Sequence, residues 1–405
     1  MKKYHLFDVY GIELEYMIVD KDSLNILPIS DLALTDAAGH LVSDFEDGPI
    51  TWSNELVMHV IELKTSGPVP TLNGLGEKFQ TSLLHLQQIL EKRNAALLPS
   101  AMHPWMNPNL EARLWPHDNN EIYDAYNRIF SCQGHGWSNL QSMHINLPFA
   151  DDQEFAKLHT AIRFLLPLLP ALSASSPIVE NKLTGIMNNR LAYYEKNQKA
   201  VPRIAGQVIP EPVLSEEEYQ SEILEKIYQD ITPHDPDEIL REEWLNSRGA
   251  IARFDRNAIE IRVLDLQECP RMDLAIADFI VSILKCLVSE TFLSFKAQLA
   301  FSTESLKQIF DATVKDADQA LINNTEYLQA WGLESKPAEA REIFTHLLAK
   351  ITAANQSPCD SEALNYIFKN GTLARRLEKS LTANTVFAVY QKLSRCLFNN
   401  TPFEC

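Results

Sequence analysis

Apolar and polar residues alternate strictly in several short segments before residue 270, which is typical of strands with one buried face. In the first segment, Ile12 and Leu14 share one face while Glu13 and Glu15 share the other. Residues of the type found in turns follow several of these segments. The predicted strands span residues 7–19, 52–64, 96–102 and 142–147, and a predicted hairpin covers 250–266.

Apolar residues at spacings of three and four predict helices over 72–93, 155–172 and 216–231, the second of them bent at Pro167 and Pro170. Beyond residue 270 the pattern is helical almost throughout, with helices expected near 272–299, 303–331, 337–354, 360–368 and 372–398. This change divides the chain into 1–270, expected to carry the functional site, and 271–405, a helical region expected to pack on it or to form a dimer interface.

The chain of 405 residues has 54 acidic and 36 basic side chains and a formal net charge of −18. This charge argues against nucleic acid and anionic membranes as partners, because both are polyanions. No uncharged apolar stretch approaches the ~20 residues that cross a bilayer, and Asp8, Glu13 and Glu15 argue against a signal peptide. Six scattered cysteines without a C-x-x-C pair predict reduced, mostly structural thiols in a cytoplasmic protein and no zinc site.

Four glutamates occupy unusual positions in the predicted strands. Glu13 and Glu15 point the same way, and such a pair is either a solvated edge, the commoner case, or a site that binds a cation between the carboxylates. Glu55 and Glu62 lie among apolar residues of the second predicted strand. Alternation places these two on opposite faces, so their joint use requires a bulge or a twist.

A histidine and a further glutamate lie on the polar faces of later strands. His144 alternates with apolar residues beside Ser142 and Asn146, and Glu260 shares a face with Arg262. A strand histidine is more often simply hydrogen-bonded, and a Glu–Arg pair is more often a surface ion pair. Together with the other glutamates, however, carboxylates plus one histidine favour Mg²⁺ or Mn²⁺ over zinc.

Arginines are concentrated around the predicted hairpin: Arg248, Arg253, Arg256 and Arg262 fall within fifteen residues. Their guanidinium groups suit phosphate or carboxylate oxygens, and metal ions with arginines suit phosphoryl transfer. The glycine-rich phosphate loops G-x-x-x-x-G-K-[ST] and G-x-G-x-x-G are absent, as is G-x-S-x-G. Phosphates would therefore be held by metal ions and arginines.

The order of the motifs resembles glutamate–cysteine ligase family 2, the carboxylate–amine ligases of the glutamine synthetase-like superfamily. The resemblance runs from residue 10 to about 280, and residues 300–405 carry no motif of it. Its pieces are G-I-E-L-E-Y, E-L-V-M-H-V-I-E-L-K-T, P-S-A-M-H-P-W, M-H-I-N-L-P, A-S-S-P-I with N-N-R downstream, and A-I-E-I-R-V-L-D.

The resemblance implies an α+β fold, in which a curved, largely antiparallel sheet has helices on its outer face and a helical C-terminal region. Its concave face would hold ATP and two or three Mg²⁺ (or Mn²⁺) ions. The implied metal ligands are Glu13, Glu15, Glu55, Glu62, His144 and Glu260. Arg262, with Glu260 and Arg253, would act on the transferred phosphoryl group, Arg253, Arg256 and His103 would contact the nucleotide, and Arg190 and Asn146 would bind the substrate.

Two positions depart from the superfamily pattern. Ala258 occupies a place where the superfamily often has an arginine, which Arg253 or Arg256 would have to replace. The P-S-A-M-H-P-W segment differs from the form G-T-H-P, which leaves the role of His103 open.

The implied activity is ATP-dependent amide formation through an acyl phosphate, most simply from glutamate and cysteine to γ-glutamylcysteine, a step of glutathione biosynthesis. Two alternatives stay open: a phosphotransferase similar to guanidino kinases, and a non-catalytic ligand-binding protein. The expected partners are small amino-acid substrates. The sequence does not specify the amine, and it leaves a homo-oligomer open.

Overall fold

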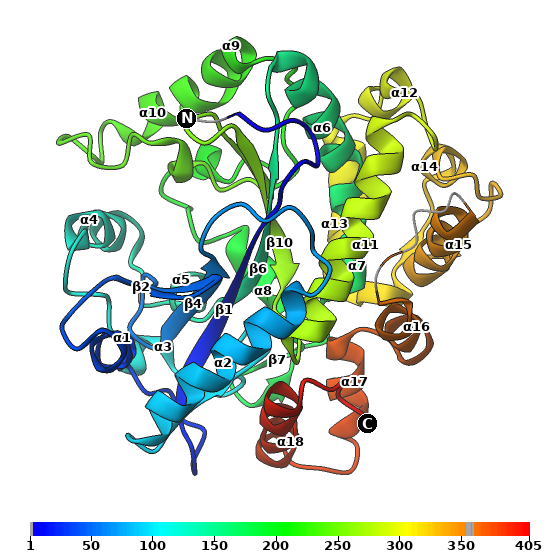
Figure 1. Ribbon diagram of the computed structural model, residues 1–405. Coiled ribbons are helices and arrows are strands. Elements are labelled where there is room, and N and C mark those ends of the chain that lie inside the picture. The colour runs from blue at the N-terminus through cyan, green and yellow to red at the C-terminus, as the bar shows by residue number, and fades with distance from the viewer. Residues whose placement is uncertain (1–2, 354–357, 359) are drawn as a thin grey trace.

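A computed structural model describes residues 3–353, 358 and 360–405, with an eight-stranded antiparallel sheet at its centre (Figure 1). The strands follow the order β2-β3-β4-β1-β6-β10-β9, and β5 pairs with the far end of β1. Their bounds are β1 Gly11–Asp20, β2 Asp44–Asp47, β3 Ile50–Asn54, β4 Val60–Thr65, β5 Ala95–Leu98, β6 Ser142–Pro148, β9 Ala250–Arg253 and β10 Ala258–Asp265. The α+β architecture with an antiparallel sheet is therefore confirmed.

Helices cover the apolar face of this sheet. Ile12, Leu14, Ile145, Ile259 and Ile261 are buried in one core together with apolar residues of the helices that pack there. These helices are α2 (Leu75–Glu91), α6 (Asp152–Leu165) and α11 (Pro270–Val288). The predicted bend after α6 is confirmed by a 3₁₀ turn at Leu166–Leu168 and a new helix, α7, at Pro170–Ser173.

The remaining helices surround the polar face and extend the apolar side, where α15 and α16 pack against α11 and against each other (Figure 1). Their bounds are α1 Ser30–Ala38, α3 Pro108–Glu111, α4 Asn120–Phe130, α5 His135–Ser138, α8 Asn189–Tyr194, α9 Glu216–Tyr219, α10 Glu225–Ile231, α12 Phe295–Leu299, α13 Thr303–Asp316, α14 Thr325–Ala330, α15 Ala340–Ala353, α16 Ser361–Asn370, α17 Leu373–Ser380 and α18 Val386–Asn399. Two-residue strands form small hairpins, β7 (Ile178–Val179) with β8 (Lys182–Leu183) and β11 (Leu321–Ile322) with β12 (Ala338–Glu339).

Three predicted C-terminal helices were too long, since 272–299, 303–331 and 372–398 are each divided in two. New helices begin where a hydroxyl or amide side chain caps the first turn, at Ser294, Asn324 and Thr385. Residue 354 of the predicted 337–354 helix and Cys359 lie outside the described residues. None of the five described cysteines forms a disulfide.

The predicted strand over 52–64 was also wrong, because this segment is a hairpin. Strands β3 and β4 pair with Trp52 opposite Leu63 and Ser53 opposite Glu62, and the chain reverses between them at Glu55 to His59. This reversal contains no glycine or proline and therefore carries no local turn signal. The reversal brings Glu55 to the same face of the sheet as Glu62, so no bulge is required for the two side chains to act together.

A buried ion pair ties the C-terminal helices to the core. The side chains of Glu268, just before α11, and Arg376, in α17, are both 0 % exposed and lie 2.5 Å apart. The same two groups hold the last residues, because Glu268 Oε1 accepts from the Phe403 amide at 3.0 Å and Arg376 Nη1 donates to the Phe403 carbonyl at 2.8 Å.

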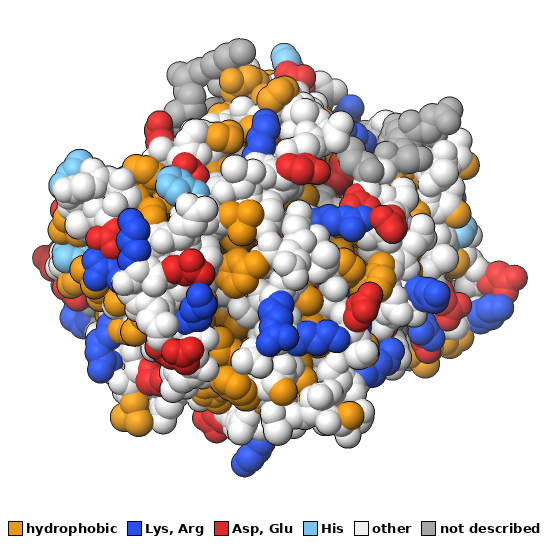
Figure 2. Space-filling model, turned by 60° about the horizontal axis from the view of Figure 1, so that its bottom comes forward, with side chains coloured by type: hydrophobic (Ala, Val, Ile, Leu, Met, Phe, Trp, Pro, Cys, Tyr) orange, Lys and Arg blue, Asp and Glu red, His pale blue; other side chains and the backbone are white. Residues whose placement is uncertain are grey.

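On the face turned forward in Figure 2, acidic, basic and apolar side chains are interspersed. The surplus of acidic residues does not form a single negative field on that face. Within the described part of the chain, no helix has both the length and the apolar character required to cross a membrane.

Candidate active site

The polar face of the central strands gathers acidic side chains through strand register. Glu15 lies opposite Glu62 across β1 and β4, and Glu13 lies opposite His144 across β1 and β6. Glu260 on β10 lies opposite Asn146 of β6. Because directly opposed residues of an antiparallel pair share a face, residues far apart in the sequence become neighbours here.

Three of these residues form a group that could hold a metal ion. One ligand atom each from Glu13, His144 and Glu260 lies within 4.8 Å of the other two. His144 Nδ1 is 2.9 Å from Glu13 Oε2 and 3.5 Å from Glu260 Oε1. Glu15 is next to them, with Oε1 at 3.8 Å from His144 Nε2. Its Oε2 accepts from the amide and the hydroxyl of Ser142 at 2.7 and 3.0 Å, which fixes the carboxylate.

The pKa values show an excess of negative charge. Burial raises the pKa of Glu55 from 4.5 to about 7, and the nearby charge of Glu15 adds to this. Burial and the charges of Glu13 and Glu55 also raise the pKa of Glu62, although Lys64 contacts it at 2.9 Å. Burial opposes ionisation of Glu13, but hydrogen bonding to His144 and the charge of His144 lower the Glu13 pKa to about 2. A cation among these groups would relieve the repulsion, and the oxygen-rich donor set with one imidazole fits Mg²⁺ or Mn²⁺.

This excess predicts an unusual pH dependence of stability. Without metal, the melting temperature should fall between about pH 7 and 8, because the folded-state pKa values of Glu55 and Glu62 are raised and the folded protein binds protons that the unfolded chain has lost. Below this range, buried histidines with lowered pKa values, His59, His103 and His159, have the opposite effect. Burial lowers the pKa of His144, but Glu13, Glu15 and Glu260 raise it by more, so the net pKa is raised. The contribution of protonated His144 to stability is therefore also lost as the pH rises. Mn²⁺ should reduce this dependence of the melting temperature on pH. Thermal melts at several pH values, in EDTA and in Mn²⁺, measure the dependence. A melting temperature in EDTA that rises across this range contradicts the prediction.

Two hollows flank the carboxylate group. The first, of about 270 Å³, is here called the aromatic hollow. Its lining includes Glu15, Glu55, His144, Arg190, Arg262, Tyr123, Tyr126, Trp137, Tyr194 and Trp244. The second, of about 540 Å³, is here called the Lys64 hollow. Its lining includes Val9, Tyr10, Glu13, Lys64, Pro68, Asn146, Pro148, Arg256 and Ala258. Since Glu13 lines one and its partner His144 lines the other, the carboxylate group separates the two hollows.

Three of the arginines expected from the sequence line the hollows, whereas Arg253 lines neither. Arg262 and Arg190 line the aromatic hollow, and Arg262 Nε is 2.9 Å from Glu260 Oε1. Arg256 lines the Lys64 hollow. Arg253 lies directly opposite Ala258 and thus on the same face, next to the position where the superfamily often has an arginine. Its guanidinium group contacts Asp255 at 2.9 Å and Glu243 at 3.7 Å.

Asn146 lies beside the carboxylates, and its Nδ2 donates to Glu13 Oε1 at 2.9 Å. Gly11 leaves room for this contact, because a Cβ at position 11 would lie 3.0 Å from Asn146 Cβ. Asn146, expected from the sequence as a substrate ligand, therefore lines the Lys64 hollow.

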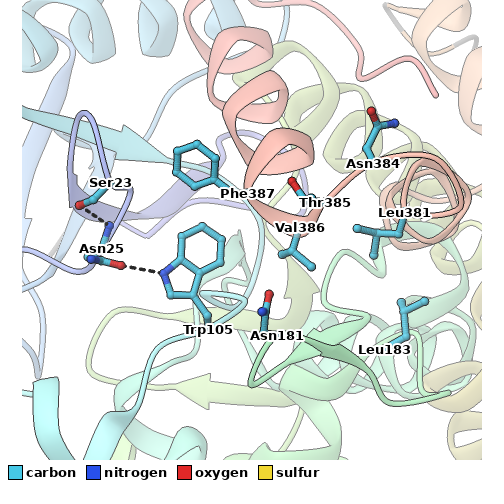
Figure 3. Close-up of a pocket in the computed structure, with 10 residues that line it drawn as sticks. All are labelled: Ser23, Asn25, Trp105, Asn181, Leu183, Leu381, Asn384, Thr385, Val386 and Phe387. Atoms are coloured by element: carbon cyan, nitrogen blue, oxygen red, sulfur yellow. Dashed lines mark hydrogen bonds between the residues drawn. The ribbon is translucent and has the colours of Figure 1, made fainter.

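The structure does not bring His103 to either hollow. Its ring is fully buried, Nε2 contacts the Leu24 carbonyl at 2.8 Å, and Nδ1 accepts from the Met106 amide at 3.0 Å. Burial lowers the pKa of His103 to about 4. The expected nucleotide contact of His103 is therefore corrected to a role in fixing the 100–106 loop. That loop places Trp105 in a separate hollow of about 660 Å³, lined by uncharged residues from the β7–β8 hairpin and the start of α18 (Figure 3).

Sequence reasoning missed Asp265 and the aromatic residues. Buried Asp265 accepts from the Ser175 amide and the Ser176 hydroxyl at 2.9 Å each, and it faces Arg190 at 3.5 Å. It thereby joins the A-S-S-P-I and N-N-R segments. Burial raises the pKa of Asp265 to about 6, despite the charge of Arg190. Asp265 ends the last motif, but the aromatic residues come from α4, α5, α8 and the turn at Glu243–Leu245, where no periodic signal indicates a site.

Comparison with known proteins identifies the family. The model of the glutamate-cysteine ligase family 2 matches residues 9–309. The chain belongs to this family. An uncharacterized protein of Archaeoglobus fulgidus is 33% identical over 399 residues, 96% of this chain and 98% of that protein. A putative glutamate–cysteine ligase 2 of Ruegeria pomeroyi is 27% identical over 188 residues, 46% of this chain and 45% of its own length.

Solved structures of ligases share the fold of this family member. Glutamate–cysteine ligase from Francisella tularensis, in complex with AMP, superimposes with a TM-score of 0.61 at 13% identity, covering 99% of this chain and 90% of that one. A bifunctional glutathione synthetase from Pasteurella multocida has a TM-score of 0.57 at 15% identity and covers 98% of this chain and 52% of that one. Because both structures have low sequence identity to this chain, the similarity shows a shared fold only.

Proposed function

We propose that the protein joins a carboxylate to an amine at the expense of ATP, with glutamate as the acid and, most simply, cysteine as the amine. Family membership supports a carboxylate–amine ligase. The observation that carries the proposal is the carboxylate group shared by two hollows, one lined by Lys64 and Arg256 and the other by Arg190 and Arg262. This arrangement suits two ligands that react across a common cation site.

The proposed metal ligands are Glu13, Glu15, Glu55, Glu62, His144 and Glu260. Bound Mg²⁺ or Mn²⁺ would neutralise negative charge on the phosphates and on the substrate carboxylate. The AMP bound to the Francisella tularensis ligase supports a nucleotide as the second ligand. The Lys64 hollow is the proposed place for it, because Lys64 and Arg256 supply positive charge and Val9, Tyr10, Pro68 and Pro148 supply apolar surface.

The chain's own groups position the reactants. In the first step a substrate carboxylate oxygen attacks the γ-phosphorus of ATP, and ADP leaves. Arg262, held beside Glu260, would stabilise the charge on the transferred phosphoryl group. In the second step the amine attacks the acyl carbon of the acyl phosphate, phosphate leaves and a proton is released. Arg190, fixed by Asp265, would bind the second carboxylate of glutamate.

Phosphate release tests this proposal. Purified protein with MgATP and glutamate should release ADP and phosphate in equal amounts only when an amine is added. A phosphotransferase would leave a stable phosphorylated product without free phosphate. No nucleotide turnover across a broad panel of amines would indicate a non-catalytic binding protein. The five described cysteines form no disulfide, which is compatible with the cytoplasmic location that we propose.

A further inference from the structure

The aromatic hollow has few cationic side chains compared with the carboxylates that two amino-acid substrates would bring into it. Besides His144, the cationic side chains among the described residues that line it are Arg190 and Arg262. Glu15 and Glu55 line the same hollow and belong to the proposed cation site. This count limits how many carboxylates the hollow can accept.

This inference rests on the proposed function, in which each of the two arginines already binds one group. Arg262 contacts Glu260 at 2.9 Å and acts on the phosphoryl group. Arg190 donates to the Arg262 carbonyl at 2.8 Å and faces Asp265 at 3.5 Å, which leaves its Nε without a partner in the described protein. Arg190 therefore serves one substrate carboxylate, the second carboxylate of glutamate. An acceptor with its own carboxylate would find no further side-chain cation among the described residues that line the hollow, which is unfavourable.

The wall of the hollow also favours a different acceptor. The rings of Tyr126 and Trp137 are 5.1 Å apart, and those of Tyr126 and Trp244 are 6.0 Å apart. Tyr123 and Tyr194 extend this surface. Such rings pack on apolar or aromatic groups and attract ammonium groups.

Two carboxamides in the same wall present unpaired oxygens. Asn197 Nδ2 donates to the Gly136 carbonyl at 2.8 Å, and Gln198 Nε2 donates to the Ser247 hydroxyl at 2.6 Å. Their oxygens, Asn197 Oδ1 and Gln198 Oε1, are buried and have no partner in the described protein. A buried acceptor without a partner favours a nearby donor such as an amine N–H and disfavours a nearby carboxylate.

We infer that the acceptor, in place of the cysteine named above as the simplest amine, is a primary amine that lacks a carboxylate and carries an aromatic side chain, an arylalkylamine. In the second step its nitrogen forms a bond to the acyl carbon, phosphate leaves with the electrons of the broken C–O bond, and one proton passes to solvent. The products are an N-arylalkyl amide of glutamate, ADP and phosphate.

Matched acceptor pairs test the inference on the whole protein with MgATP and glutamate. Phenethylamine should exceed phenylalanine, and cysteamine should exceed cysteine, each by about tenfold or more in kcat/KM. Phosphate release that favours phenylalanine and cysteine instead overturns the inference and leaves the proposed function intact. Absence of phosphate release with these four acceptors and with every other amine tested overturns the proposed function and the inference with it.

Variants of Trp244 give a second test. Trp244→Arg adds the missing cation and should shift the preference towards phenylalanine by about tenfold, whereas Trp244→Leu, which removes the ring without adding charge, should weaken phenethylamine and leave phenylalanine poor. Quenching of tryptophan fluorescence by phenethylamine without ATP should be reduced in Trp244→Leu. Trp105→Phe, in the separate hollow of Figure 3, is the control and should retain the quenching. Equal amine preference in Trp244→Arg and Trp244→Leu contradicts the charge argument.

Discussion

Replacement of Glu260 by glutamine should lower kcat/KM of the ligation by about 10³-fold while the protein stays folded. Glu260 belongs to the group in which ligand atoms of Glu13, His144 and Glu260 lie within 4.8 Å, and it also contacts Arg262 at 2.9 Å. The amide keeps the shape of the side chain but removes its charge. The substitution therefore weakens cation binding and releases Arg262 from its position at the same time.

The measurement is amine-dependent phosphate release, together with a thermal melt in EDTA and in Mn²⁺. The shift in melting temperature produced by Mn²⁺ should decrease in Glu260→Gln, since an ion that binds only the folded state stabilises it by mass action. Glu217→Gln, on the exposed first turn of α9, is the matched control and should change neither quantity. Full activity of Glu260→Gln at moderate Mn²⁺ would exclude Glu260 from the catalytic group.

Replacement of Arg376 by methionine should destabilise the protein by about 3–5 kcal/mol, because it leaves the carboxylate of Glu268 buried without its partner. The Phe403 carbonyl loses its donor as well. Unfolding in urea, followed by tryptophan fluorescence, should show a lower midpoint. Arg271→Met is the matched control: Arg271 pairs with Asp360 at 2.6 Å, but the two side chains are 33% and 28% exposed, so its loss should cost about 1 kcal/mol or less.

The double variant Glu268→Leu with Arg376→Met separates charge burial from packing. It removes both charges, so it should recover a large part of the stability lost in Arg376→Met. A double variant as unstable as Arg376→Met alone would show that the contacts to Phe403, rather than the unpaired carboxylate, account for the loss.

The sheet and the acidic side chains could be predicted because both depend on local alternation. Glu13, Glu15, His144 and Glu260 each stand on a strand whose other face is apolar, so burial of that face fixes where their side chains point. Which strands would be neighbours did not follow from alternation. The resemblance to a known family supplied the antiparallel sheet, and the order of its strands came only from the structure.

The parts that sequence reasoning missed depend on contacts between distant segments. The reversal at Glu55 has no turn residues, and it is held because every residue of β3 pairs with a residue of β4 between Ile61 and Thr65. The aromatic hollow combines Tyr126, Trp137 and Trp244 from three separate segments, none of which is periodic at these positions. The motif around His103 predicted a contact with the nucleotide. In the folded protein, however, both ring nitrogens of His103 contact backbone groups.

The carboxylate group is a wall of both hollows, since Glu13 faces one and His144, its hydrogen-bonded partner, faces the other. A ligand that adds or removes charge on one side therefore changes the potential felt on the opposite side. Binding linkage requires such an influence to be mutual: if the nucleotide changes the affinity for the acid by some factor, the acid changes the affinity for the nucleotide by the same factor. If both hollows bind their ligands as proposed, the two sites are thermodynamically coupled through the carboxylate group, without any need for a moving domain.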